Sequence, residues 1–177
     1  MISVFGISNV GKSTLLKKVR ESFGDEVGIV SVGAEMSRRH PPEAFKGKAC
    51  LDETEAEVWE IFDAQYHEAL AKGASVILCD GQPRSVRQVD HMLANYPRLS
   101  VLWLHADQDA LVSRAVRRAD AELRYERLTN DRLQLFDVVH KLHEEDIKIH
   151  TIDTSMPTEH WVHHCLTHIR LAGLYGV

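Results

Sequence analysis

Short runs of apolar and β-branched residues alternate along the chain with segments in which apolar residues recur at helical spacing. We predict strands at Ile2–Phe5, Val27–Val32, Ser75–Cys79, Val101–His105 and Ile147–Ile152. The run Ser75–Cys79 (SVILC) is apolar almost throughout, which is typical of a strand buried on both faces of a parallel sheet. Strands that alternate with helices imply right-handed crossovers and a parallel sheet between two helical layers.

The remaining segments show helical spacing of their apolar residues. Leu15, Val19 and Phe23 fall on one face of a helix that follows the first strand. Further helices are predicted over residues 52–72, 84–96, 107–118, 121–145 and 157–171, with Asp107 as an N-cap. Pro41, Pro42 and Gly47 predict an irregular segment from Ala34 to Leu51. We see no repeat and no linker, so we expect one domain over residues 1–177.

Composition narrows the class of protein. The formal net charge of −5 lacks the basic excess of proteins that wrap nucleic acid, so we expect no nucleic-acid polymer as a partner. The three cysteines, Cys50, Cys79 and Cys165, have no metal-like spacing and favour a reducing cytoplasm. We find no signal peptide and no apolar stretch of membrane-spanning length, and therefore expect a soluble cytoplasmic protein without a membrane partner.

Residues 6–13 (GISNVGKS) fit the phosphate-loop pattern G-x-x-x-x-G-K-[ST] completely, between a predicted strand and a predicted helix. Glycines let successive N–H groups point inward, and the helix N-terminus adds a positive dipole end. Lys12 should reach the β- and γ-phosphates of ATP, and the Ser13 hydroxyl should coordinate Mg²⁺. A GTPase is disfavoured because no N-K-x-D motif is present. The expected ATP-binding residues of this loop are Gly6, Asn9, Val10, Gly11, Lys12, Ser13 and Thr14.

A second motif begins at the end of the SVILC strand, where an open parallel sheet presents its ligands. The stretch 80–88 (DGQPRSVRQ) closely resembles the adenylate kinase branch of the nucleoside monophosphate kinases, whose signature is D-G-[FY]-P-R followed four residues later by Gln. Gln82 stands where that family has an aromatic residue. The matching residues are Asp80, Gly81, Pro83, Arg84 and Gln88.

This resemblance implies roles for the acceptor side. Asp80 would help to hold Mg²⁺ through water, and Gly81 would line the acceptor site. Arg84 offers a planar fork for the acceptor phosphate, which makes it a candidate catalytic residue. Gln88 can donate and accept at once, which matches the N1 and N6 edge of adenine.

The stretch 31–38 (SVGAEMSR) resembles the family's S-T-G-D-M-L-R segment, with one extra residue. By that comparison Gly33 opens a helix of an acceptor-binding arm, which with the following helix spans residues 33–72. Arg38 would be a second arginine for the acceptor phosphate, with Arg39 as a possible substitute. Val32 replaces a threonine of the family.

Residues 107–118 (DQDALVSRAVRR) resemble the family helix that precedes the lid. Arg114 would lie under the adenine of ATP and Arg118 at its phosphates, although Arg117 could share the second role. A short lid is expected over residues 119–131. Three cations remain for closing the site: Arg124 and Arg127 toward the acceptor, and Arg132 as a catalytic arginine.

The last predicted helix carries a row of histidines. His160, His164 and His168 are four apart and share a face, a geometry that can bind zinc. No glutamate occupies the H-E-x-x-H position, so we favour a solvated or partly packed helix face.

The expected fold is therefore an α/β, three-layer P-loop fold like that of the nucleoside monophosphate kinases, with a five-stranded parallel sheet in the order 2-3-1-4-5 and helices on both faces. The expected activity is that of a nucleoside or deoxynucleoside monophosphate kinase in nucleotide biosynthesis, with Mg²⁺ and ATP and with AMP or dAMP as the favoured acceptor. Such a reaction needs alignment and cations rather than a general base. Two alternatives stay open, a shikimate- or gluconate-type small-molecule kinase and a nucleotide-dependent binding switch.

Overall fold

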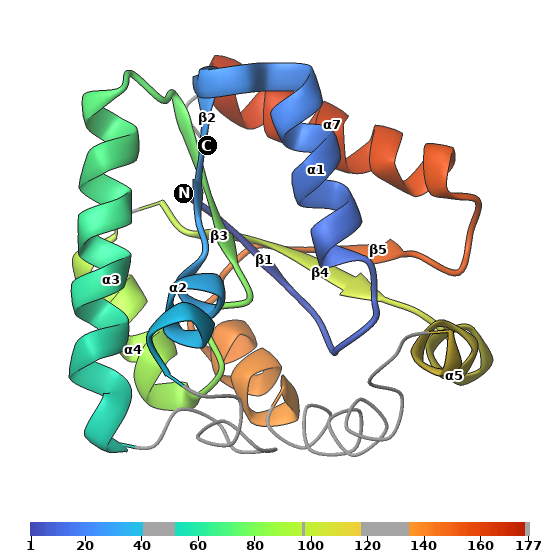
Figure 1. The fold of residues 1–177 in the computed structure, drawn as a ribbon, viewed down its shortest axis with the longest axis horizontal. Helices are drawn as coiled ribbons and strands as arrows, with labels where there is room; N and C mark the ends of the chain where they lie inside the picture. The colour runs from blue at the N-terminus through green and yellow to red at the C-terminus, as the bar shows by residue number, and fades with distance from the viewer. Residues whose placement is uncertain (41–51, 97, 118–134, 176–177) are drawn as a thin grey trace.

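The central sheet has five parallel strands in the order β2-β3-β1-β4-β5, which confirms the predicted fold (Figure 1). The computed structural model describes residues 1–40, 52–96, 98–117 and 135–175. The strands are β1 (Ile2–Phe5), β2 (Val27–Val30), β3 (Val76–Asp80), β4 (Ser100–His105) and β5 (Ile149–Asp153). Each begins and ends within two residues of its predicted bounds.

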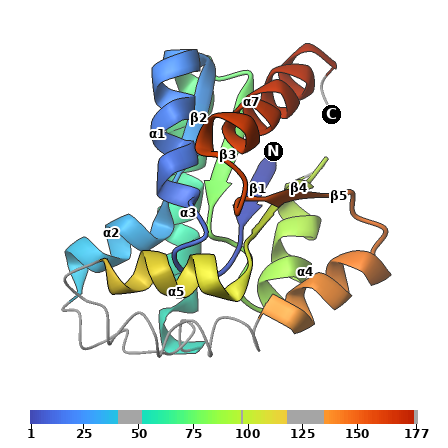
Figure 2. The same cartoon turned by 90° about the vertical axis from the view of Figure 1, so that its right-hand side faces the viewer.

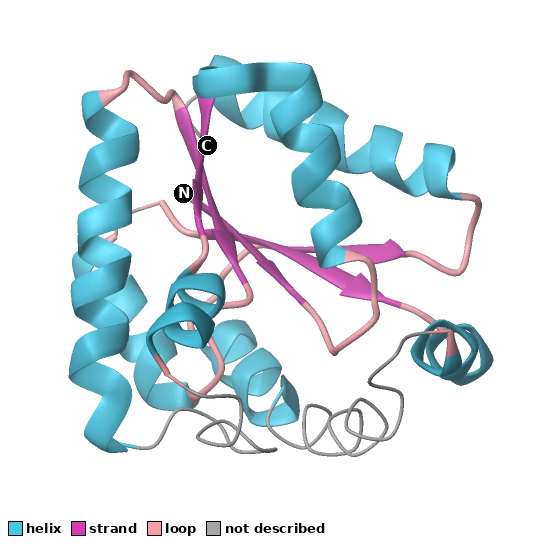
Figure 3. Ribbon diagram, in the orientation of Figure 1, coloured by secondary structure: helices cyan, strands magenta, loops and turns pink. Residues whose placement is uncertain are grey.

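Helices cover both faces of this sheet (Figures 2 and 3). The buried residues form two separate cores, one on each face. On one face lie α1 (Lys12–Phe23), α5 (Gln108–Val116) and α7 (Thr158–Tyr175). On the other face lie α3 (Asp52–Ala71), α4 (Val86–Asn95) and a helix over residues 135–144. Among the described residues, no helix combines the length and apolar character needed to cross a bilayer.

The first core holds α1 against the sheet. Leu15 and Val19, one helical turn apart, are both fully buried against β1 and α7. Burying a side chain of this size contributes about 1.5–3 kcal/mol. These two residues hold α1 against the sheet. Its N-terminus lies near the carboxyl end of β1 because only residues 6–11 connect the two elements.

One prediction about local structure was wrong. The segment predicted as irregular from Ala34 begins inside a helix, α2 (Val32–Arg39). Val32 and Met36 are both buried and lie one turn apart, which gives this short helix an apolar face toward the second core. The prolines that led to the irregular prediction follow its end. The family resemblance predicted that this helix begins at Gly33, one residue after the observed start of α2 at Val32.

The pairing of β1 with β3 brings the two motifs together. Val4 lies opposite Asp80 in the register, and the N–H of Gly81 donates to the Val4 carbonyl at 2.9 Å. The loop after β1 and the loop after β3 therefore leave the same edge of the sheet from adjacent strands.

Candidate nucleotide and acceptor site

The phosphate loop joins β1 to α1 and is shaped by backbone that favours glycine. A Cβ on Gly6 would lie 2.3 Å from the Leu104 carbonyl oxygen, so no side chain fits there. Gly11 has φ of 112° and forms the N-cap of α1, and Asn9 is left-handed with φ of 66°. This conformation turns the loop over the start of α1.

Lys12 is the first residue of α1 and lies over the loop. Its Nζ donates to the carbonyl oxygens of Gly6 at 2.5 Å and Ile7 at 3.0 Å. Ser13 and Thr14 follow in the first helical turn and are exposed. The first N–H groups of a helix have no partner within it, so this turn offers donors to an anion. The first turn of α1 holds no acidic residue that would oppose such binding.

The rear of the loop contacts the turn after β5, a contact that the sequence reasoning missed. Thr154 is fully buried there, and its Oγ lies 2.7 Å from the Val10 carbonyl oxygen. Arg114 donates from Nη1 to the Thr154 Oγ1 at 3.1 Å and to the carbonyls of Asn9 and Val10 at 3.4 Å. A signal was present in the sequence, because residue 154 follows a predicted strand at the edge where ligands bind.

The resemblance predicted that Arg114 lies under the adenine of ATP. In the structure, the Arg114 side chain makes hydrogen bonds to the protein itself. Its guanidinium connects α5 to the phosphate loop and to the main-chain oxygen of Thr154. The partner arginine in that prediction, Arg118, lies outside the described residues. The same is true of the lid over residues 119–131 and of Arg124, Arg127 and Arg132.

The loop after β3 is the candidate acceptor site. Asp80 accepts a hydrogen bond of 3.0 Å from the Ser31 hydroxyl at the end of β2. Gly81 has φ of 76°, a left-handed value that turns the chain away from the strand. Pro83 is buried, and the exposed Arg84 follows it. The structure thus places Asp80 and Arg84 on the same turn, beside the phosphate loop.

Arg84 and Gln88 are tied to each other and to the turn. The Arg84 Nε donates to the Gly81 carbonyl at 3.0 Å, which holds the guanidinium close to the loop. Within the described chain, no acidic side chain pairs with this guanidinium. Gln88 is buried, and its Oε1 accepts a hydrogen bond of 2.7 Å from the main-chain N–H of Arg84. Ser85 caps α4 by accepting from the Gln88 N–H at 3.3 Å.

Gln82, the residue that departs from the family signature, lies inside the protein. It is 6% exposed, and its carbonyl accepts a hydrogen bond from the Ser3 hydroxyl of β1. Its side-chain Oε1 is buried and has no hydrogen-bond partner in the described structure. Gln82 therefore anchors the loop to the sheet through its main chain.

Arg38 and Arg39 lie on α2 and are both compensated by acidic residues. Glu35 accepts from Arg38 at 2.6 Å and from Arg39 at 2.9 Å, and Arg39 also pairs with Glu57 at 3.3 Å. Hydrogen bonds from the two guanidinium groups lower the pKa of Glu35 to about 2. Gly33 lies in the first turn of the same helix. An anionic acceptor would have to compete with Glu35 for Arg38.

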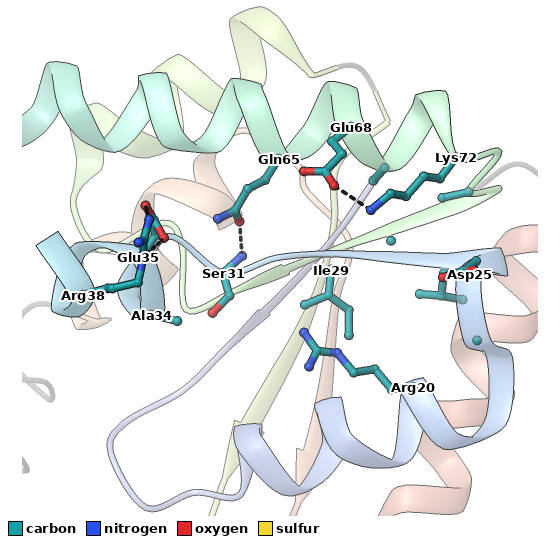
Figure 4. A pocket seen from close by; sticks show the side chains of 15 residues that line it. Arg20, Asp25, Ile29, Ser31, Ala34, Glu35, Arg38, Gln65, Glu68 and Lys72 are labelled. Atoms are coloured by element: carbon teal, nitrogen blue, oxygen red, sulfur yellow. Dashed lines mark hydrogen bonds and ion pairs between the residues drawn. The ribbon is translucent and has the colours of Figure 1, made fainter.

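Two pockets flank these elements. A pocket of about 690 Å³ follows the edge strand β2 between α1 and α3 (Figure 4). Its lining includes Arg38 but no residue of the phosphate loop. A more apolar pocket of about 400 Å³ borders the phosphate loop at Ile7, between the end of β4 and the helix over residues 135–144.

The predicted metal ligands supply suitable oxygen donors. The Ser13 hydroxyl lies in the first turn of α1, and the Asp80 carboxylate ends β3; both are hard ligands of the kind that Mg²⁺ prefers. Among the described residues, no cluster of three or more histidine, cysteine, aspartate or glutamate side chains forms a metal site. On α7, His160 and His164 are exposed, whereas His168 is partly buried.

Comparison with known proteins agrees with this architecture. A family model described as an AAA domain matches residues 1–142. The structure is similar to an unliganded sugar kinase from Janibacter sp. HTCC2649, with a TM-score of 0.65 and 20% identity over 98% of this chain and 95% of that one. It is also similar to a gluconokinase from Sinorhizobium meliloti 1021, with a TM-score of 0.62 and 22% identity over 97% and 92% of the two chains.

These two structural likenesses establish the fold alone, and no curated protein matches the sequence significantly. The family match rests on the stretch that carries the phosphate loop, the Asp80–Gln88 loop and α5. The chain belongs to the AAA domain family, with a fold that it shares with P-loop kinases.

Proposed function

We propose that this protein is an ATP-dependent kinase that phosphorylates a small anionic molecule bound at the Asp80–Gln88 loop. One relationship carries the proposal: the Gly81–Val4 hydrogen bond sets an exposed arginine loop beside the phosphate loop. Lys12 and the first turn of α1 supply donors for the phosphates of ATP. Arg84 supplies a fork for an anion on the neighbouring strand end.

The acceptor class favoured here is a hydroxyl group on a sugar acid or a related polyhydroxy acid. The solved structures to which the chain is similar include a sugar kinase and a gluconokinase. A carboxylate on the acceptor would suit the Arg84 fork. A hydroxyl must lose its proton during transfer, and Asp80 is a carboxylate at this strand end that can accept it. The Gln88 carbonyl is engaged by Arg84, which argues against adenine recognition by that group.

A second candidate is the transfer to a nucleoside or deoxynucleoside monophosphate. It is favoured by the register of Asp80, Gly81, Pro83, Arg84 and Gln88, which matches that kinase family. Its acceptor is a phosphate that is already largely dianionic at neutral pH, because its second pKa is about 6. In that reaction Asp80 would have no proton to accept, and Arg84 would bind the acceptor phosphate.

ATP would enter with Mg²⁺, for which the Ser13 hydroxyl is the candidate ligand. Asp80 would hold the metal through water in the monophosphate reaction, where it does not act as a base. The metal would offset negative charge on the transferred phosphoryl group. The contribution of the chain is alignment. The Gly6–Leu104 contact fixes the start of the loop, and the N-terminus of α1 directs its N–H groups toward the phosphates.

The test is an assay of ADP release with Mg²⁺ and ATP across sugar acids, neutral sugars and all ribo- and deoxyribonucleoside monophosphates. Turnover that depends on one acceptor class would support the proposal and choose between the two candidates. The Lys12→Ala variant is the control for a contaminating kinase. ADP formation that is slow and independent of every acceptor would contradict the proposal and favour a nucleotide-dependent switch.

A further inference from the structure

The turn after β5 holds the phosphate loop from behind through one buried hydroxyl. The parallel pairing of β4 with β5 continues past the strand, because the Thr154 N–H donates to the His105 carbonyl at 2.8 Å. This pairing fixes the position of Thr154, which is fully buried. The Thr154 side chain then lies against Val10, a residue 144 positions earlier in the chain.

The Thr154 hydroxyl has one hydrogen to donate and two carbonyl oxygens within reach. The Val10 oxygen lies at 2.7 Å and the His105 oxygen at 3.0 Å, so the geometry favours donation to Val10. Arg114 donates from Nη1 to the Thr154 Oγ1 at 3.1 Å, which uses an oxygen lone pair and orients the hydroxyl, and the same nitrogen lies 3.4 Å from the Val10 oxygen. The hydroxyl is thus both held by Arg114 and directed at the loop.

The planarity of the peptide bond links this contact to the orientation of the Gly11 N–H. The Val10 carbonyl and the Gly11 N–H belong to one planar trans peptide group, in which they point in opposite directions. A carbonyl drawn rearward to Thr154 therefore turns the Gly11 N–H forward, to the side where a phosphate binds. Gly11 needs such a constraint, because a glycine with φ of 112° has wide conformational freedom.

We infer that Thr154 is a positioning residue for ATP, whose hydroxyl fixes the peptide between Val10 and Gly11 so that the Gly11 N–H faces the phosphates. This inference rests on the proposed kinase function. A second contact supports it from the same side. The indole of Trp161, at the start of α7, lies 3.2 Å from where a Cβ of Gly11 would be and limits how far this peptide can rotate.

The test measures binding of Mg²⁺·ATP by calorimetry without any acceptor. Thr154→Val keeps the β-branched shape and removes the hydroxyl, and we expect its Kd to rise about tenfold, since the Val10 carbonyl loses its shorter hydrogen bond and keeps only the longer one from Arg114. Thr154→Ser restores the hydroxyl and should return the Kd to within about twofold of the wild-type value, the difference that one retained hydrogen bond predicts. At saturating ATP the kcat should fall much less than the affinity.

Thr151→Val is the matched control, because Thr151 lies on β5, the strand that leads to Thr154, and is exposed. It should bind ATP as the wild type does. If Thr154→Val fails to fold, Thr154→Cys replaces it, and a Kd between those of the wild type and a tenfold loss is expected for its weaker donor. A folded Thr154→Val or Thr154→Cys protein with wild-type affinity would overturn the inference.

The two proposals fail in different ways. A wild-type protein that binds no Mg²⁺·ATP contradicts the kinase function itself. A wild-type protein that binds ATP while the Thr154 variants bind equally well contradicts only the positioning role.

Discussion

The main-chain N–H of Arg84 donates a hydrogen bond of 2.7 Å to Oε1 of Gln88, a side chain that is 3% exposed. This bond closes the turn between β3 and α4 and sets the direction in which Arg84 leaves the main chain. Gln88 therefore stabilises the turn, a role that is separate from any contact with a substrate base.

A Gln88→Met variant tests whether Gln88 stabilises the turn. The methionine fills the same space but leaves the partly buried Arg84 N–H without this acceptor, which costs about 1 kcal/mol of unfolding free energy. Urea denaturation should show this loss, and the KM of the acceptor should rise whatever its chemistry. Gln108→Met, at an exposed position of α5, is the control and should leave both unchanged. A Gln88→Met protein of normal stability whose preference shifts only among purine and pyrimidine acceptors would instead support base recognition by Gln88.

Arg84 should govern acceptor affinity. Arg84→Ala removes a charge-assisted fork, and we expect kcat/KM for the acceptor to fall about 10- to 100-fold, the equivalent of about 1.5–3 kcal/mol. Arg84→Lys should recover little, because an ammonium group cannot bind an anion through two parallel N–H groups. The measurement is steady-state kinetics with the acceptor varied at saturating ATP.

Arg87→Ala is the matched control for this series. Arg87 is an exposed arginine on the first turn of α4 and pairs with Glu55 at 3.2 Å. The Arg87 side chain is 67% exposed and the Glu55 side chain 16%, so the loss of Arg87 should lower stability only modestly and should leave the acceptor kinetics unchanged. Equal losses for Arg84→Ala and Arg87→Ala would mean that net charge, and not the Asp80–Gln88 loop, binds the acceptor.

Lys12 should be required for transfer but not for folding. Lys12→Ala removes the only side-chain cation at the start of α1, and we expect the rate to fall about 10²–10³-fold, as is common for a preorganised donor. The thermal unfolding midpoint should change little, because the carbonyls that Lys12 contacts lie at a partly exposed loop. Lys17→Ala, on the exposed face of the same helix, should retain full activity. An active Lys12→Ala protein would remove the P-loop from the mechanism.

The strands were predictable because each is a short β-branched run between helical segments, as Val76–Asp80 illustrates. The start of α2 was harder to predict. Its apolar face consists of Val32 and Met36 alone, a pattern too short to outweigh the prolines that follow. The sequence motifs identified the phosphate loop and the Asp80–Gln88 loop, and β1–β3 pairing explains why the two lie together.

Other features of the site depend on contacts that no local pattern encodes. The Thr154–Val10 hydrogen bond joins the last strand to the first loop, and it exists only because β5 pairs with β4 in one register. The engagement of Gln88 by Arg84 depends on the path of a turn that contains a buried Gln82. The side-chain type of Gln88 suggested adenine recognition. In the structure its Oε1 already accepts a hydrogen bond from the Arg84 N–H.

The pair of histidines His150 and His168 should make the free energy of unfolding depend on pH. The ring centroids of His168 on α7 and His150 on β5 lie 3.9 Å apart. Both Nε2 atoms are buried and have no hydrogen-bond partner in the described chain. Burial, and then the nearby charges of His150 and Lys148, lower the pKa of His168 to about 4, and burial also lowers the pKa of His150. The folded protein therefore holds these rings neutral, whereas the unfolded chain takes up protons near the ordinary histidine pKa of about 6.5.

The sign follows from proton uptake. Between about pH 6.5 and pH 4 the unfolded state binds more protons than the folded state, so the unfolding free energy falls as the pH falls through this range. Above about pH 6.5 the pair contributes no pH dependence. Thermal midpoints measured from pH 7.5 to pH 4.5 should decline in the wild type and decline less in His168→Phe, which keeps an aromatic ring without a titrating nitrogen. His160→Phe, at an exposed position of the same helix, should follow the wild type. If His168→Phe loses stability toward acid as steeply as the wild type does, other groups must cause that loss.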